Sequence, residues 1–129
     1  MPFATATVFT NTGRAIVTNR IVGAGTEPRF IALGTGATVA ARTAVAADTA
    51  LSTEVETRAS GTSSRVTTTF ANDTYQTIGT VTASALRSVD EAGTFDAVTT
   101  GSMSVSATFG VVTLQTGDSL QITARTQFA

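Results

Sequence analysis

Apolar and polar residues alternate most regularly in the C-terminal third of the chain. The alternation runs through two stretches in which every second residue is apolar: Met103, Val105, Ala107 and Phe109 in the first, and Leu120, Ile122 and Ala124 in the second. A period of two is typical of a strand with one face buried. A short apolar strand at 111–114 and a turn at 116–118 separate the two stretches. The pattern therefore predicts an antiparallel meander.

The N-terminal part of the chain predicts a hairpin followed by one apolar strand. A strand or extended arm is expected over 4–10, a turn at 11–13, where Asn and Gly accept the backbone angles of a tight reversal, and a second strand over 15–22. Residues 29–33 are mostly apolar, which predicts a short strand buried on both faces.

The region 34–62 is expected to be a long loop region that contains one short helix. Residues 34–47 are a low-complexity run of Gly, Thr, Ala and Val, and loops longer than about a dozen residues tend to be functional or mobile. The helix is expected over 48–55, because Asp48 or Thr49 can cap it and Leu51 and Val55 then share a face.

Further strands are expected between this region and the meander. They cover 64–70 and 74–84, with a turn at 71–73 between them and a β-bulge near Gly79, and a turn at 90–93 leads into the meander.

This inventory predicts a single all-β domain over 1–129. Its expected form is an antiparallel two-sheet β-sandwich, a jelly roll, with one short helix. Residues 1–12 are expected to form an N-terminal arm or an edge strand.

Composition narrows the classes of partner. Much of the 42% hydrophobic fraction is alanine, so the core is expected to be light and to gain stability from a partner surface. The net charge is −1 and the cationic residues are all scattered arginines, so no nucleic-acid partner is expected. No apolar run is long enough to predict a membrane span. Without cysteine, neither disulfides nor thiolate metal sites can form.

The side chains available for chemistry are few. The chain has no His, Cys or Lys, which removes the usual general base and the common nucleophile and zinc schemes. Asp90, Glu91 and Asp96 could form the carboxylate pair of a glycosidase. Such enzymes line their groove with aromatic residues, whereas this chain has one Tyr and no Trp. We therefore interpret these acids as turn residues and expect no enzyme and no catalytic residues.

Metal and phosphate sites have equally weak support. Asp90, Glu91 and Asp96, or Asn72 with Asp73, could offer oxygen ligands to calcium, but neither group has the dense alternating acids of a calcium loop. The run 34–36, Gly-Thr-Gly, has no following Lys and no helix opening directly after it, unlike a phosphate loop. We expect no metal site, no cofactor and no small-molecule substrate.

An ordered set of short segments runs through residues 28–128. The segments are FIALGTG at 30–36, DTALSTEV at 48–55, YQTIGT at 75–80, EAGTFD at 91–96, ATF at 107–109 and GDSLQI at 117–122. In order and spacing they resemble small structural proteins of tailed bacteriophages. Some of these proteins are similar to the jelly-roll cement, or decoration, proteins that clamp the outside of a capsid. The segments carry no catalytic residues, so the resemblance transfers none.

The resemblance implies a virion structural protein on the outer surface of the capsid. Its expected partners are the major capsid protein and copies of itself, as a homodimer or trimer, with the loop 34–47 and the arm 1–12 reaching the neighbouring subunit. Two alternatives stay open: a tail or tail-tip structural protein, and a glycan-binding jelly-roll module. The sequence does not distinguish a head from a tail location.

Overall fold

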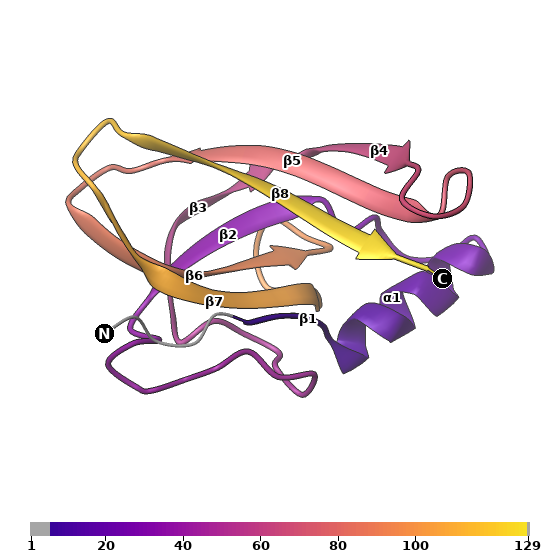
Figure 1. Ribbon diagram of the computed structural model, residues 1–129, viewed down its shortest axis with the longest axis horizontal. Coiled ribbons are helices and arrows are strands. Elements are labelled where there is room, and N and C mark those ends of the chain that lie inside the picture. The colour runs from indigo at the N-terminus through magenta and orange to yellow at the C-terminus, as the bar shows by residue number, and fades with distance from the viewer. Residues whose placement is uncertain (1–5, 129) are drawn as a thin grey trace.

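The computed structural model describes residues 6–128, and these form two antiparallel sheets packed face to face (Figure 1). The larger sheet has five strands in the order β1-β7-β6-β2-β3, and the smaller has three in the order β4-β5-β8. The strands are β1 (Ala6–Phe9), β2 (Phe30–Thr35), β3 (Thr53–Ser60), β4 (Thr62–Val66), β5 (Thr74–Thr82), β6 (Arg87–Phe95), β7 (Met103–Leu114) and β8 (Ser119–Gln127). The predicted all-β antiparallel two-sheet sandwich is confirmed, and its one short helix lies elsewhere in the chain than expected.

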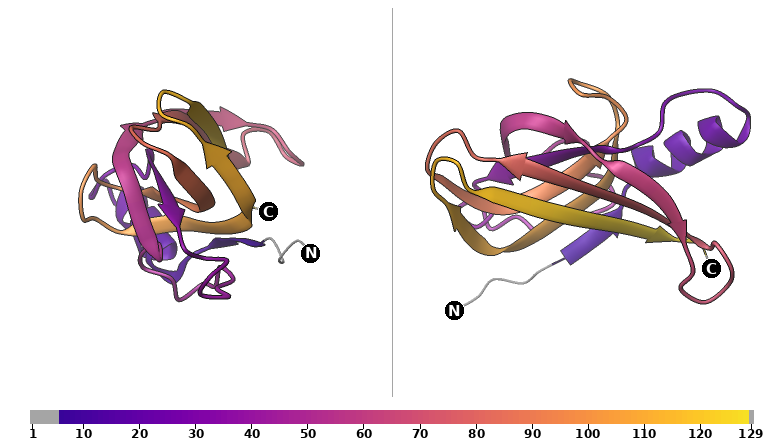
Figure 2. Two further views of the ribbon diagram at one scale, coloured as in Figure 1. Left: turned by 90° about the vertical axis from the view of Figure 1, so that its left-hand side faces the viewer. Right: turned by 90° about the horizontal axis from the view of Figure 1, so that it is seen from above.

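The main core lies between the two sheets. Ile31 and Leu33 of β2 point into it and are almost fully buried, together with Val81 of β5 and Val89 of β6. Apolar residues at alternate positions of each strand produce this layer, because successive side chains point to opposite faces. The left-hand view in Figure 2 looks end-on along the sandwich and shows the two sheets as separate layers.

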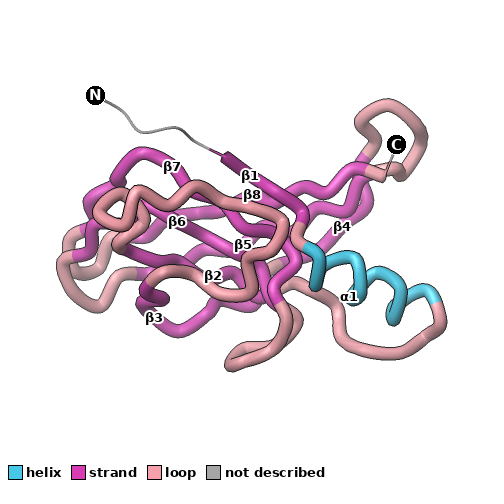
Figure 3. The backbone as a smooth tube through the Cα atoms, turned by 90° about the horizontal axis from the view of Figure 1, so that it is seen from below, coloured by secondary structure: helices cyan, strands magenta, loops and turns pink. Residues whose placement is uncertain are grey.

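A second apolar cluster covers the outer face of the five-stranded sheet. It joins Ala32, Phe95 and Met103 to Leu51, which comes from the loop 36–52. This loop runs across the outer face of the sheet (Figure 3). Ala32 is therefore buried on one face of β2 and Ile31 on the other, which confirms the prediction of a strand buried on both faces.

The same loop changes the environment of β7. The polar residues Ser104, Ser106 and Thr108 are at most 3% exposed, since they lie under the loop or against β6 rather than in solvent. The Thr108 hydroxyl accepts a hydrogen bond from the Ala44 amide. The two strands expected at 102–109 and 111–114 are one strand, because pairing with β6 continues through both stretches. The period of two located the strand but did not show that both of its faces are covered.

The turn expected at 11–13 and the strand expected over 15–22 are both wrong, because residues 11–21 form α1 (Asn11–Ile21). The Thr10 hydroxyl accepts a hydrogen bond from the Gly13 amide at 3.0 Å and caps the helix. A side chain at Gly13 would lie 2.7 Å from the Ser104 carbonyl oxygen, so glycine lets the helix pack directly on β7. α1 falls short of the length and apolar character that a membrane-spanning helix requires.

The short helix expected over 48–55 is also wrong. These residues end the loop 36–52 and begin β3 at Thr53. Asp48, the expected cap, turns its carboxylate toward the half-buried Arg42 instead. The remainder of the expected loop region to residue 62 is mostly strand, because β3 continues to Ser60, with 59–60 paired to β2, and β4 begins at Thr62.

Two expected local features lie elsewhere. The residues 90–93 are in the middle of β6 and buried, not in a turn, and the reversal before β7 comes after Phe95. No register shift interrupts the pairing of β5, so the bulge expected near Gly79 is absent from that strand. Register shifts occur instead between Ile31 and Leu33, and in the pairing of β6 with β7.

Candidate functional site

Two of the three acids proposed as a catalytic pair or calcium site cap loops. The Asp90 carboxylate accepts hydrogen bonds from the amides of Ala37 at 3.1 Å and Thr38 at 2.8 Å. The Asp96 carboxylate accepts one from the Ser102 amide at 2.7 Å. Each carboxylate therefore satisfies backbone amides at a reversal of the chain, as expected of acids that cap turns. Asp90 itself lies in a strand and caps a turn elsewhere in the sequence.

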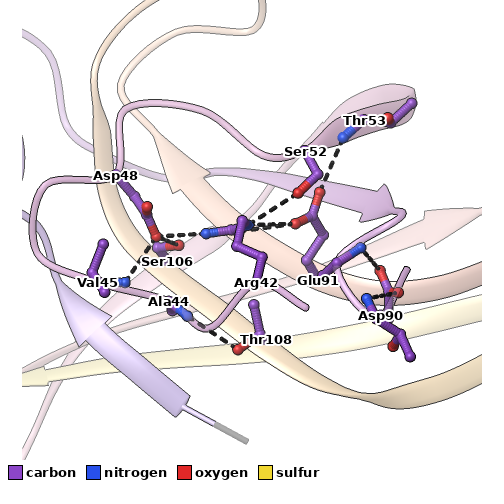
Figure 4. Close-up of polar contacts among 12 residues, drawn as sticks. Arg42, Ala44, Val45, Asp48, Ser52, Thr53, Asp90, Glu91, Ser106 and Thr108 are labelled. Atoms are coloured by element: carbon purple, nitrogen blue, oxygen red, sulfur yellow. Dashed lines mark hydrogen bonds and ion pairs between the residues drawn. The ribbon is translucent and has the colours of Figure 1, made fainter. Parts of the chain in front are cut away.

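Glu91 is fully buried and neutralises an arginine from the covering loop. One carboxylate oxygen lies 2.9 Å from Nη2 of Arg42, and the other accepts a hydrogen bond from the Thr53 amide at 3.2 Å (Figure 4). Its side chain lies over Gly34 of β2, where any β-carbon would meet the Glu91 Cγ at 2.6 Å. Gly34 is thus part of a strand that makes room for Glu91, and the run 34–36 does not act as a phosphate loop.

Asp48 completes this network on the other side of Arg42. Its Oδ2 lies 2.7 Å from Arg42 Nη1 and accepts hydrogen bonds from the Val45 amide and the Ser106 hydroxyl (Figure 4). Burial alone would raise the pKa of Asp48, but these hydrogen bonds and the arginine charge outweigh it and hold the pKa below its usual value. We call Arg42, Asp48 and Glu91 the loop clamp, since they attach the loop 36–52 to β6 and β7.

Acid is expected to destabilise the protein through Asp48. Its pKa is lower in the folded chain than in the unfolded chain, where it is about 3.9. The carboxylate therefore contributes its full stability above that value, and the contribution is lost as pH falls through the lower, folded pKa. We expect the melting temperature to drop as pH falls below about 4. In Asp48→Asn, which is less stable than the wild type at pH 7, the drop should be smaller. An equal drop in both proteins would contradict the assignment.

The second calcium candidate is also a turn. The Asp73 carboxylate accepts hydrogen bonds from the amides of Phe70, Thr68 and Thr69, and these lower its pKa. Asn72 has a positive φ of 59°, which Asn tolerates well. Over residues 6–128, no three His, Cys, Asp or Glu side chains come together in a way that could hold a metal ion.

The main hollow of the molecule is a groove along one open side of the sandwich. Within residues 6–128, β1 pairs only with β7 and β8 only with β5, so each is an edge strand. Adjoining cavities follow the space between these edges, and the one beneath α1 has a volume of ≈ 480 Å³. The apolar part of the lining comes from α1, β1, β7 and β8 with their flanks, and it includes Ile21, Phe9, Val105, Ile122, Ala124 and Phe128. We call this feature the open-edge groove.

One buried hydroxyl in the groove lacks a partner. Thr77 of β5 is 0% exposed, lines the cavity beneath α1, and its Oγ1 forms no hydrogen bond with any described residue. A buried polar group without a partner costs about 1–3 kcal/mol. Nearby, the Tyr75 hydroxyl donates to Glu27 at 3.1 Å, and burial together with the Glu27 charge raises the pKa of Tyr75.

Arginines dominate the charge along the groove. Arg14 and Arg20 of α1 and Arg125 of β8 line it, and none of them forms an ion pair with the acids of residues 6–128. Glu27 is the acid among the lining residues, and it holds the Tyr75 hydroxyl. The lining therefore combines apolar side chains, one unpartnered hydroxyl and an excess of positive charge.

Sequence reasoning missed the open-edge groove. The alternation in β8 marked its inward-facing residues as core, but nothing local showed that the neighbouring strand would be absent on that side. Searches of family models, curated proteins and solved structures find no match for this chain. The interpretation of the site therefore rests on its geometry and on the residues that compose it.

Proposed function

We propose that this protein is a structural protein of a bacteriophage virion. In this proposal it is a capsid cement protein that binds the major capsid protein lattice on the outer surface, as a homodimer or trimer, and catalyses no reaction. The resemblance of the short segments within 28–128 to such proteins is the starting point. The structure adds one supporting observation, which concerns the loop 36–52.

The supporting observation is an apolar side chain presented on a fixed turn. Val39 is 93% exposed, although it lies in a turn that Asp90 holds through the amides of Ala37 and Thr38. The Arg42 amide also donates to the Ala37 carbonyl oxygen, which closes the same turn. A surface that is ordered before binding loses little entropy on contact, so such a turn suits a static protein interface.

The contacts of the polar side chains favour a structural role over an enzyme and over a glycan-binding module. Asp90, Glu91 and Asp96 are engaged in loop capping and in the loop clamp, which leaves them no role as a free carboxylate pair. Tyr75 is partly buried with its hydroxyl on Glu27, so it does not offer an open aromatic platform to a glycan. Repeated over a lattice, a modest contact of this kind would act through multivalency.

The test is binding to purified shells that lack this protein. Wild-type protein should appear by cryo-electron microscopy as regular density at fixed lattice positions. Val39→Asp should bind at least about tenfold more weakly, because it buries a charge at the contact. Thr116→Asp, which adds the same charge on an exposed turn elsewhere, should bind as the wild type does.

The other outcomes are equally informative. Bare shells with density at the tail or tail tip would replace the cement role by the tail alternative. Equal binding of Val39→Asp and the wild type would remove the loop 36–52 from the interface. A bare shell and a bare tail together would reject the virion role.

A further inference from the structure

We infer that the open-edge groove binds an extended segment of a partner chain, with apolar residues at alternate positions and acidic residues at its ends. This inference deepens the proposed function, because it names the part of the partner that is bound, and it rests on that function only for the partner's identity. Four features of the groove support it.

The first feature is the pair of unpaired strand edges. Within the described chain, β8 bonds to β5 along its whole length and offers its other edge, over nine residues, to no strand. β1 likewise bonds only to β7. An added strand of about eight residues would span roughly 26 Å and could pair with the free backbone groups of β8. Addition of a strand to a sheet edge is a common mode of peptide recognition.

The second feature is the difference in burial between the inward faces of two neighbouring strands. On β5 the inward-facing residues Thr77 and Val81 are at most 3% exposed. Their cross-strand partners on β8, Ala124 and Leu120, remain partly exposed, as does Ile122 between them. The β8 side of the sandwich thus lacks a cover that the rest of the core possesses. Apolar side chains at alternate positions of an added strand would supply it.

The third feature is found at the end of the groove beneath α1. Ile21 is 79% exposed and Phe128 is 49% exposed, and both line the cavity there. Thr77 faces the same cavity with its unpartnered hydroxyl. A partner segment would cover the two apolar side chains, and a polar group of that segment would give Thr77 the hydrogen bond that it lacks.

The fourth feature is charge. Arg14, Arg20 and Arg125 border the groove without an ion pair to a described acid, whereas the lining acid, Glu27, accepts a hydrogen bond from the Tyr75 hydroxyl. A partner segment that complements these arginines would therefore carry negative charges at its ends and be apolar between them. A small anionic amphiphile would satisfy the charge and the apolar lining, but it would leave the backbone edge of β8 unused. An extended polypeptide uses all four features.

The experiment selects ligands from a displayed library of random peptides of about 12 residues, so it does not depend on knowing the partner. Wild-type protein should enrich peptides with alternating apolar residues and acidic ends. Ala124→Phe fills the groove and should abolish the enrichment. Thr80→Phe adds the same ring to an exposed position of β5 that does not line the groove, and it should enrich the same peptides.

A second pair of variants tests the charge without placing a large side chain in the core. Arg20→Gln with Arg125→Gln should lose the preference for acidic ends and weaken binding of a selected peptide at least about tenfold. Arg65→Gln, at an exposed position of β4 that does not line the groove beneath α1, should keep both. These polar substitutions keep the inference testable if Ala124→Phe does not fold.

Three results would overturn the inference: no enriched peptide, enrichment that Ala124→Phe leaves unchanged, or enriched peptides without acidic residues at their ends. Saturable binding of 8-anilinonaphthalene-1-sulfonate that Ala124→Phe abolishes, without peptide enrichment, would instead assign the groove to a small anionic amphiphile. Peptide enrichment together with bare shells would reject the cement role and leave the groove assignment standing. Binding to shells without peptide enrichment would reject the groove assignment and leave the cement role standing.

Discussion

Replacing Arg42 with methionine is expected to lower the free energy of unfolding by about 3–5 kcal/mol. The substitution leaves Glu91, whose side chain is 0% exposed, without the cation that lies 2.9 Å from its carboxylate. It also removes the arginine partner of Asp48, and with it one of the contacts that attach the loop 36–52 to the sheet. Urea unfolding followed by circular dichroism measures the change.

Two further variants separate the loop clamp from a general effect of charge removal. Arg87→Met breaks the more exposed ion pair with Glu56 and should cost no more than about 1 kcal/mol. The double variant with methionine at both 42 and 91 removes the buried charges together and should regain most of the lost stability. If Arg42→Met unfolded at the same urea concentration as the wild type, the loop clamp would not support the fold.

Replacing Phe95 with alanine is expected to cost about 3–5 kcal/mol. The ring is 2% exposed and belongs to the apolar cluster on the outer face of the five-stranded sheet. The Arg58 guanidinium carbon lies 3.6 Å from the ring centroid. Arg58 also donates hydrogen bonds to the carbonyl oxygens of Ala97 and Thr100. Losing the ring therefore creates a cavity and loosens the arginine that holds the turn between β6 and β7.

Thermal unfolding of Phe95→Ala tests this expectation, with Phe70→Ala as the control. Phe70 is 65% exposed at a hairpin tip, so its truncation should change stability by no more than about 0.5 kcal/mol. A similar melting temperature for Phe95→Ala and the wild type would mean that the loop 36–52 does not form a packed layer on the sheet.

The features predicted correctly from the sequence are those that depend on neighbouring residues. β8 followed from the alternation of Leu120, Ile122 and Ala124 with polar residues, and the turn before it followed from Thr-Gly-Asp. β5 and the reversal at 71–73 have the same basis. Side-chain periodicity and turn residues act within a few positions of the chain, so one sequence contains enough information to locate them.

α1 was missed because its residues favour a strand. Ile16, Val17 and Thr18 are β-branched, and no strong apolar stripe marks the helix. The cap at Thr10 and the close contact of Gly13 with β7 stabilise the helix instead. Both depend on a strand more than 90 residues away, since the Thr10 hydroxyl also donates to the Met103 carbonyl oxygen.

The acids of β6 were misplaced for a related reason. Asp90, Glu91 and Gly93 have the composition of a turn, and acids are seldom buried without a partner. The partner of Glu91 is Arg42, 49 positions earlier, in a loop whose sequence shows no sign of its position over the sheet. Once that arginine is present, Glu91 can lie in the centre of a strand.

Taken alone, the sequence determined the fold class, most of the strands, the turns at 71–73 and 116–118, and the shortage of reactive side chains. The tertiary structure decided which elements meet: the loop 36–52 lies on the outer face of the larger sheet, Arg42 reaches Glu91, and β1 and β8 remain as edges around the open-edge groove. Strand formation reflects local periodicity, whereas strand order and the position of a covering loop depend on contacts between distant segments. The open-edge groove depends on such contacts between distant segments, so no single stretch of the sequence revealed it.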